Sequence, residues 1–310
     1  MKELLRKYFP GVVEKYRLLR KKVYYYQKKY STLAMKRRIL QKEYKNRMGI
    51  DLHLENPKRY TEKIQWQKLY GMDERMSLLS DKYKVREWIK ETIGEEYLLP
   101  MITAVRSFEE IDFDKLPNRF VIKSNNSSGW NIIVKNKADI DLVDIKEKIN
   151  RWRKINYAYH SALELQYANI EPIFVIEEYV NDTNGELNDY KFMCFNGKVY
   201  YCWVDTGRFE HHTRTVYNLN WERQPWSQVY NPTEVYVEKP QNFDKMVELA
   251  TQLCQGFSHV RVDLYNVDGK IYFGEMTFTN GNGLDKIVPD EYDEKLGELF
   301  PLEKGNHKSK

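Results

Sequence analysis

The stretch "VRVDLYNVDGKIYFGEMTF", residues 260–278, determines the fold that this sequence predicts. Two alternating apolar segments flank an Asp-Gly pair at 268–269, which is typical of a tight hairpin turn. Arg261 and Asp263 stand two residues apart, so their side chains lie on one face of the first strand. Glu275 stands on the second strand, where the turn brings it close to Asp263. The hairpin therefore gathers charged side chains on otherwise apolar strands.

Asp263 and Glu275 are candidate magnesium ligands. Two carboxylates this close repel each other unless a cation lies between them, and carboxylate and phosphate oxygens are natural ligands of Mg²⁺. The alternative is a pair of solvated side chains on an exposed strand face. The run "NGNG" at 280–283 favours the metal, because glycine lets the backbone approach a ligand closely.

A second hairpin is predicted over residues 189–207, "DYKFMCFNGKVYYCWVDTG", with its turn at Asn-Gly 196–197. Asp189 and Lys191 interrupt its first strand in the same alternating manner. The segment "IFVIEEYV", residues 173–180, reads as a short buried strand that ends in two glutamates. Adjacent residues of a strand point in opposite directions, so only one of these glutamates can face a shared site.

The segment "FVIKSNNSSGWNIIV", residues 120–134, reads as two strands joined by a soft loop, with Lys123 at the end of the first strand. Cations, paired carboxylates and a Gly/Ser loop are what phosphoryl transfer from a nucleotide requires. The P-loop and protein-kinase motifs are missing from the sequence, which excludes those two folds. The cations of this set are Lys123, Lys191, Arg208, Arg214 and Arg261.

The segment "RFEHHTRTVYN" adds two histidines and two arginines, at positions 208–218. His211 and His212 are either acid/base groups or ordinary surface-loop residues. The guanidinium groups of Arg208 and Arg214 match the geometry of carboxylates and phosphates, which suits them to an anionic substrate.

The order of elements predicts an α+β protein of several small subdomains. Helical periodicity covers residues 1–50, 77–94, 138–168 and 242–256, and strands dominate after Pro172. The predicted parts are a basic helical arm (1–50), a helical and strand region (51–115), a lid subdomain with a mobile loop (116–175) and a C-terminal subdomain (176–310).

Composition favours a soluble protein. The 310 residues are 42% hydrophobic and 31% charged, no apolar run is long enough to span a membrane, and no signal peptide is evident. The three cysteines show no CxxC spacing, which fits a reduced cytoplasm and gives no zinc site.

The charge is distributed unevenly along the chain. Residues 1–50 hold 16 Lys/Arg and 3 Asp/Glu, a net of +13, so a chain of net +5 leaves −8 for the remainder. The arm is either a solvated helix or a surface that attracts anionic lipid head groups or an acidic polymer. Nucleic acid fits less well, because the rest of the chain is acidic and carries no recognised binding motif.

Several stretches, in this order, resemble the ATP-grasp fold, and within it the TupA-like (teichuronopeptide biosynthesis) branch. The resemblance covers about residues 50–300. It is carried by "YTEKIQWQKLY" (60–70), "DKYKVREWI" (81–89), the 120–134 segment, "IEEYV" (176–180), "DYKFMCFNGK" (189–198), "VDTGRFEHHTR" (204–214) and the 260–283 segment. It implies ATP held between two α+β subdomains.

The resemblance also implies roles for single residues. Lys82 and Lys123 match phosphate-contacting lysines, and residues 124–130 match a loop that closes over the phosphates. The implied nucleotide-binding residues are Lys82, Lys123, Ser127, Ser128, Gly129, Trp130, Glu177, Glu178, Tyr179, Asp189 and Lys191. The implied metal ligands are Asp263, Glu275 and Thr277, where better-known relatives carry asparagine in the last place. The catalytic residues are Arg261, Lys191 and Arg214, and the substrate-binding residues are Arg208, His212, Arg214 and Asn280.

The implied function is an ATP- and Mg²⁺-dependent carboxylate–amine ligase that works through an acyl-phosphate. Its carboxylate would belong to a uronic acid or amino-acid component of a bacterial surface polysaccharide. The basic arm would hold the protein at the inner face of the membrane. Alternatives are a glycosyltransferase that uses a nucleotide sugar, an ATP-grasp kinase of a small acceptor, and a non-catalytic nucleotide-binding module.

Overall fold

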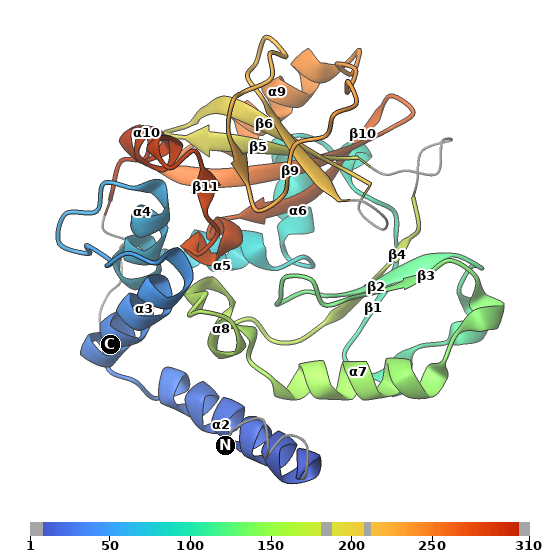
Figure 1. The fold of residues 1–310 in the computed structure, drawn as a ribbon. Coiled ribbons are helices and arrows are strands. Elements are labelled where there is room, and N and C mark those ends of the chain that lie inside the picture. Colours follow the sequence, from blue (N-terminus) through green and yellow to red (C-terminus); the bar gives the residue numbers. More distant parts are fainter. Residues whose placement is uncertain (1–8, 181–187, 208–211, 304–310) are drawn as a thin grey trace.

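The computed structural model describes residues 9–180, 188–207 and 212–303 (Figure 1). Its α-helices are α2 (Pro10–Lys29), α3 (Leu33–Met48), α4 (Tyr60–Trp66), α5 (Glu74–Ser80), α6 (Val85–Thr92), α7 (Leu142–Lys154), α8 (Tyr157–His160), α9 (Phe243–Leu253) and α10 (Glu291–Leu299). Its strands are β1 (Met101–Val105), β2 (Phe120–Ser124), β3 (Asn131–Val134), β4 (Phe174–Glu178), β5 (Asp189–Phe195), β6 (Lys198–Thr206), β7 (Thr213–Tyr217), β8 (Ser227–Gln228), β9 (His259–Val267), β10 (Lys270–Thr277) and β11 (Ile287–Val288).

The smaller sheet has four antiparallel strands in the order β1-β4-β2-β3. Helix α7 lies along it, as Figure 1 shows. The apolar side chains of β2 and β4 pack against those of α7 in one buried cluster, which includes Phe120, Ile122, Ile176, Ile145, Ile149 and Trp152. Strand β1, from the predicted 51–115 region, and β4, which spans the predicted boundary at 175/176, both belong to this sheet.

The larger sheet has five antiparallel strands in the order β10-β9-β5-β6-β7. Both predicted hairpins are confirmed, because β5 turns into β6 at 196–197 and β9 turns into β10 at 268–269. One face of the sheet packs on α9 through Phe192, Val262 and Phe243. The mixture of helices with two antiparallel sheets confirms the predicted α+β class.

The opposite face of the larger sheet is divided. At one end Phe195 and Trp203 pack with Tyr60 of α4 and Phe300 in a second apolar cluster. At the other end the same face carries the charged residues of β5 and β9. Side chains two residues apart along a strand share a face, so one face supplies both a hydrophobic core and a polar site.

A β-bulge in the β9–β10 hairpin sets the direction of Glu275. Phe273 pairs with Leu264, but Glu275 and not Gly274 pairs with Asp263. The bulge adds one unpaired residue to β10, which turns the following side chain to the other face of the sheet. Glu275 therefore lies on the same face as Asp263.

Three of the predicted helices were too long. Residues 77–94 form α5 and α6, separated by a turn in which the Asp81 carboxylate accepts hydrogen bonds from the backbone N–H groups of Tyr83 and Lys84. Residues 138–168 form α7, α8 and a 3₁₀ turn, because Asn156 caps the start of a new helix. The 1–50 arm is α2 and α3, divided where Thr32 caps α3. Side-chain caps at such positions compete with helix continuation.

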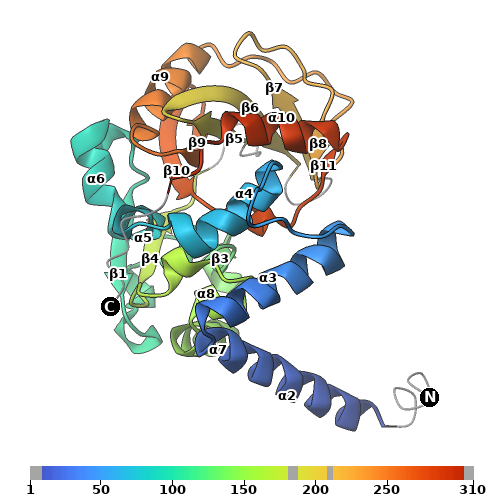
Figure 2. The ribbon, with the colours of Figure 1, turned by 90° about the vertical axis from the view of Figure 1, so that its left-hand side faces the viewer.

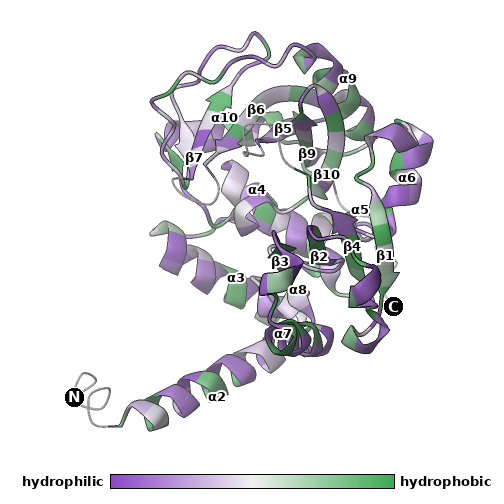
Figure 3. Cartoon of the chain, turned by 90° about the vertical axis from the view of Figure 1, so that its right-hand side faces the viewer, coloured by the Kyte–Doolittle hydropathy of each residue, from purple (hydrophilic) through white to green (hydrophobic). Residues whose placement is uncertain are grey.

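Helix α2 extends away from the body, and only its C-terminal end reaches α8 (Figures 1 and 2). Hydrophilic and hydrophobic residues alternate along it (Figure 3). Within the described ranges, α2 included, no helix has the length and apolar character needed to span a membrane.

Candidate ATP-binding site

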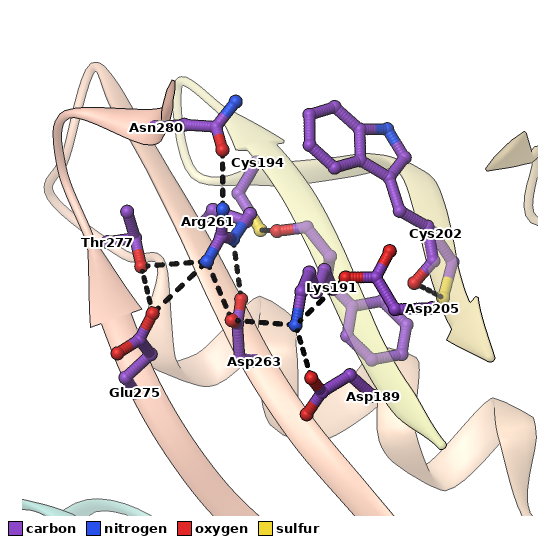
Figure 4. A network of polar contacts seen from close by, with 12 residues as sticks. Asp189, Lys191, Cys194, Cys202, Asp205, Arg261, Asp263, Glu275, Thr277 and Asn280 are labelled. Carbon is purple, nitrogen blue, oxygen red and sulfur yellow. Dashed lines mark hydrogen bonds and ion pairs between the residues drawn. The ribbon is translucent and has the colours of Figure 1, made fainter. Parts of the chain in front are cut away.

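Arg261 is the centre of a buried polar network on β9 and β10 (Figure 4). Its Nε and Nη2 donate to the two carboxylate oxygens of Asp263, each at 2.7 Å. Nη2 also lies 3.1 Å from both Glu275 Oε1 and Thr277 Oγ1, and Nη1 donates to Asn280 Oδ1. The structure thus brings together Arg261, which was predicted to be catalytic, the three predicted metal ligands and the predicted substrate residue Asn280.

Lys191 forms a second centre beside the first. Its Nζ lies 2.9 Å from Asp189 Oδ2, 3.3 Å from Asp263 Oδ2 and 3.6 Å from Asp205 Oδ2. Arg214 of β7 closes the group with a two-pronged contact to Asp205, at 2.6 and 2.8 Å. The bidentate geometry fixes the guanidinium plane, as is usual for arginine–carboxylate pairs.

The opposite charges in this cluster keep one another ionised. Burial alone would raise the pKa of Asp263, but Arg261 and Lys191 outweigh it and hold that pKa below its ordinary value. Burial alone would lower the pKa of Arg261, and the Asp263 and Glu275 carboxylates raise it instead. The site therefore keeps charges of both signs at neutral pH: cations that suit an anionic substrate and carboxylates that suit a metal ion.

Two further lysines lie near the 124–130 loop: Lys123 at the end of β2, and Lys82 in the turn between α5 and α6. Lys123 Nζ lies 2.6 Å from Glu177 Oε2, and Arg86 of α6 contacts the other oxygen of Glu177 at 3.3 Å. Lys82 donates through Nζ to the carbonyl of Ser127. Burial lowers the pKa of Lys82, and Glu275 across the site opposes that shift. Lys82 therefore lies close enough to Glu275 for the carboxylate charge to affect its pKa.

The 124–130 loop contains both buried and exposed positions. Ser127 is buried, and among the described residues its hydroxyl has no hydrogen-bond partner. Ser128 and Gly129 are exposed, and Gly129 adopts a φ of +75°, which favours glycine. Trp130 stacks on Trp152 of α7, with ring centroids 5.6 Å apart. The indole thus packs inside the smaller subdomain.

Other predicted residues lie farther from these contacts or outside the described ranges. Glu177 is buried while Glu178 is exposed, so the expectation that only one glutamate faces inward is confirmed. Arg119 lies over the Tyr179 ring, 4.3 Å from its centroid. His212 Nε2 is 3.4 Å from Asp205 Oδ2. Arg208 lies outside the described residues.

Asp205 and Arg86 belong to the site but were not among the predicted residues. The Asn-Gly turn alone would place Val204 opposite Asp189, and a β-bulge between Met193 and Cys194 shifts the pairing to Asp205, so the sequence predicts this acid only to within one residue. Arg86 carries no comparable signal, since its contact with Glu177 depends on how α6 packs against β4.

The residues present fit ATP and Mg²⁺. Within the described part of the chain, no group of three or more His, Cys, Asp or Glu side chains is arranged to hold a metal alone. Mg²⁺ in nucleotide sites takes one or two carboxylates and completes its shell with phosphate oxygens and water. Asp263 and Glu275 could supply those carboxylates, and Thr277 could supply a hydroxyl. The Ser127 hydroxyl has no hydrogen-bond partner among the described residues, so no protein group there competes with a ligand for it.

The fold thus has two antiparallel sheets, with Lys123 on the smaller and the paired acids Asp263 and Glu275 on the larger, as the resemblance to the ATP-grasp class implies. The sequence model of one family in this class, described as TupA-like ATPgrasp, matches residues 62–301. The chain therefore belongs to the TupA-like ATP-grasp family, as the resemblance implied. No curated protein sequence matches it closely enough to count as a relative.

Solved structures with a similar fold include D-alanine–D-alanine ligase from Bacillus anthracis, in complex with ATP. That protein is 16% identical, with a TM-score of 0.43 over 73% of this chain and 65% of its own. L-amino acid ligase from Bacillus licheniformis is 14% identical, with a TM-score of 0.42 over 72% of this chain and 49% of its own. The chain thus spans about half to two thirds of these proteins.

Proposed function

We propose that this chain is an ATP- and Mg²⁺-dependent carboxylate–amine ligase. The observation that carries the proposal is the buried Arg261, which holds Asp263, Glu275 and Asn280, while Lys82 lies within electrostatic range of both Glu275 and Lys123. Charge of both signs is needed there, because triphosphate and carboxylate are anions and the metal is a cation.

The chemistry divides into two displacements. A substrate carboxylate oxygen attacks the γ-phosphorus, the bond to the β–γ bridging oxygen breaks, and ADP leaves. An amine nitrogen then attacks the acyl carbon, the bond to the phosphate oxygen breaks, and the nitrogen loses a proton. Positioning and charge neutralisation dominate both steps.

Each residue has one part in this scheme. Lys82 and Lys123 bind phosphate oxygens, and Arg261 neutralises the charge that develops on the acyl-phosphate. Asp263 and Glu275 would hold Mg²⁺, which when bound would supply positive charge to the phosphate oxygens. Lys191 keeps Asp189, Asp205 and Asp263 in place.

The proposed carboxylate belongs to a uronic acid or an amino acid of a bacterial surface polysaccharide. The family's name and the basic arm support this choice. Arg214, Asn280 and His212 lie beside the Arg261 network and are the proposed contacts for that anionic substrate.

The test is a substrate screen with purified protein and Mg-ATP. We expect ADP release only when a uronate or amino acid and an amine are both present, a product mass one water below the sum of the two, and no turnover in EDTA. ADP release without amine, with a stable phosphorylated product, would identify a kinase. A larger thermal shift with a UDP-sugar than with Mg-ATP would identify a glycosyltransferase, and no turnover with any pair would contradict the proposal.

We further propose that α2 holds the protein at the inner face of an anionic membrane. Apolar residues recur along the helix at helical spacing, and their side chains are 44–65% exposed; they are Val12, Tyr16, Leu19, Val23 and Tyr26. The helix carries seven Lys/Arg and one acidic residue. Exposed apolar stripes on basic helices are typical of helices that lie in the lipid interface.

Vesicle binding tests the α2 proposal. Leu19→Glu/Val23→Glu is expected to reduce co-sedimentation with phosphatidylglycerol vesicles by about tenfold, because it places two anions in the stripe. Val235→Glu, at a valine on a loop that is more exposed than Leu19 or Val23, is the control and should bind as the unaltered protein does. Equal binding to phosphatidylcholine vesicles, or no loss in the double variant, would contradict the proposal.

A further inference from the structure

The C-terminal end of α2 is fastened to α8 by two side chains. Asn156, the cap of α8, donates its backbone N–H to Tyr25 Oη at 3.2 Å. Lys28 Nζ donates to the Ser161 carbonyl at 2.5 Å and to the His160 carbonyl at 3.4 Å. These contacts hold both ends of α8.

Lys28 is unusual among the lysines of the arm because only 4% of it is exposed. A buried ammonium is costly unless it is hydrogen-bonded. The carbonyls at the end of α8 supply the acceptors, and the Tyr24 ring lies under the charge, with its centroid 4.9 Å from Nζ. Burial of the Lys28 ammonium is therefore favourable only when the carbonyls of α8 are in place to accept its hydrogen bonds.

Helix α8 in turn supports the loop that follows Lys123. The Trp130 ring meets Tyr157 edge-on at 5.2 Å and lies 5.7 Å from the His160 ring. The Trp130 carbonyl accepts a hydrogen bond from the Ser124 N–H at 3.0 Å, which closes the base of the loop. The loop contains a single glycine, which limits its conformational freedom. The position of Trp130 at its end therefore helps to set the position of the loop.

We infer that Tyr25 and Lys28 are positioning residues for the phosphate-binding loop, acting through α8 and Trp130. Among the described residues, neither forms a hydrogen bond or ion pair with a proposed metal ligand, and both lie on the arm outside the residues matched by the family. The inference rests on the proposed function in one respect, that the 124–130 loop contacts ATP. Through these two residues the basic arm becomes part of the ATP site.

The chain offers a matched pair of double variants as a test. Tyr25→Phe/Lys28→Met removes the hydrogen bonds to Asn156, His160 and Ser161 but keeps the apolar bulk of both side chains, including the ring contact of residue 25 with Tyr159. Tyr26→Phe/Lys29→Met makes the same chemical changes one residue along, at two exposed positions. Both are made in the full chain.

Two measurements separate the outcomes. Mg-ATP affinity by calorimetry is expected to fall about tenfold in Tyr25→Phe/Lys28→Met and to change less than twofold in the control pair. Amide hydrogen exchange over residues 124–131 should accelerate in the first pair alone, while the β9 amides near Arg261 stay protected.

Unchanged loop exchange would overturn the inference, and so would equal acceleration in the loop and in β9, which would report general destabilisation. If the unaltered protein bound no Mg-ATP, the proposed function would fail. The exchange measurement would still decide whether the arm positions the loop.

Discussion

Arg261→Ala is expected to lower kcat/KM for the ligase reaction by about a thousandfold, the loss seen when a preorganised charge at a reacting centre is removed. Arg261 contacts Asp263, Glu275, Thr277 and Asn280 simultaneously, so the change also leaves buried acceptors without their donor. Breaking a buried charge pair from one side costs about 3–5 kcal/mol of folding free energy. ADP release and thermal unfolding are the measurements.

Arg261→Lys separates chemistry from folding. Lysine keeps the positive charge beside Asp263 but cannot reproduce the forked contacts, so we expect a folded protein with an activity about a hundredfold reduced. Arg75→Ala is the control, since Arg75 also pairs with an acid, Asp73 at 2.9 Å, but at the surface. A folded Arg261→Ala protein with undiminished turnover would exclude the assigned role.

Lys123→Met is expected to weaken Mg-ATP binding by about a hundredfold. A charge-assisted hydrogen bond contributes about 1.5–3 kcal/mol, and each 1.4 kcal/mol is a factor of ten in affinity. The same change removes one of the two cations that contact the buried Glu177 and leaves Arg86, at 3.3 Å, so the positive charge that would attract the phosphates is lost. Calorimetric titration measures the effect.

The matched experiment removes the acid as well. Lys123→Met/Glu177→Gln should recover part of the lost affinity, because the negative charge of Glu177 is removed. The recovery should be partial, because the contact of Lys123 with phosphate is still missing. Lys198→Met, at an exposed hairpin position, should bind as the unaltered chain. If Lys123→Met bound Mg-ATP normally, Lys123 would have only a structural role with Glu177.

The hairpins were predictable because their turns and their alternation agree. Asp-Gly at 268–269 and Asn-Gly at 196–197 define the turns, and period-two alternation then places Arg261, Asp263 and Lys191 on one face. The pairing of Asp263 with Glu275 follows to within one residue. The remaining shift of one residue comes from the β-bulge, and no local sequence pattern predicts that bulge.

The helical parts were less predictable, because apolar periodicity continues across breaks that single polar residues cause. Asp81 and Asn156 form side-chain hydrogen bonds that end one helix and begin another. The turn after Asp81 carries Lys82, so the break is also what presents this lysine to the loop. The contact of Arg86 with Glu177, and the packing of Trp130 on Trp152, depend on tertiary placement, which one sequence does not encode locally.

The bulge at Gly274 makes the site depend on an irregularity in strand pairing. If β9 and β10 continued in regular register through Gly274, Glu275 would stand opposite Val262 and point into the apolar core beneath α9. Strict alternation counted from Phe273 therefore assigns the acid to the wrong face of the sheet. A comparison of related chains that scores alternation alone would discard Glu275, whereas one that allows one extra residue between Phe273 and the acid would keep it.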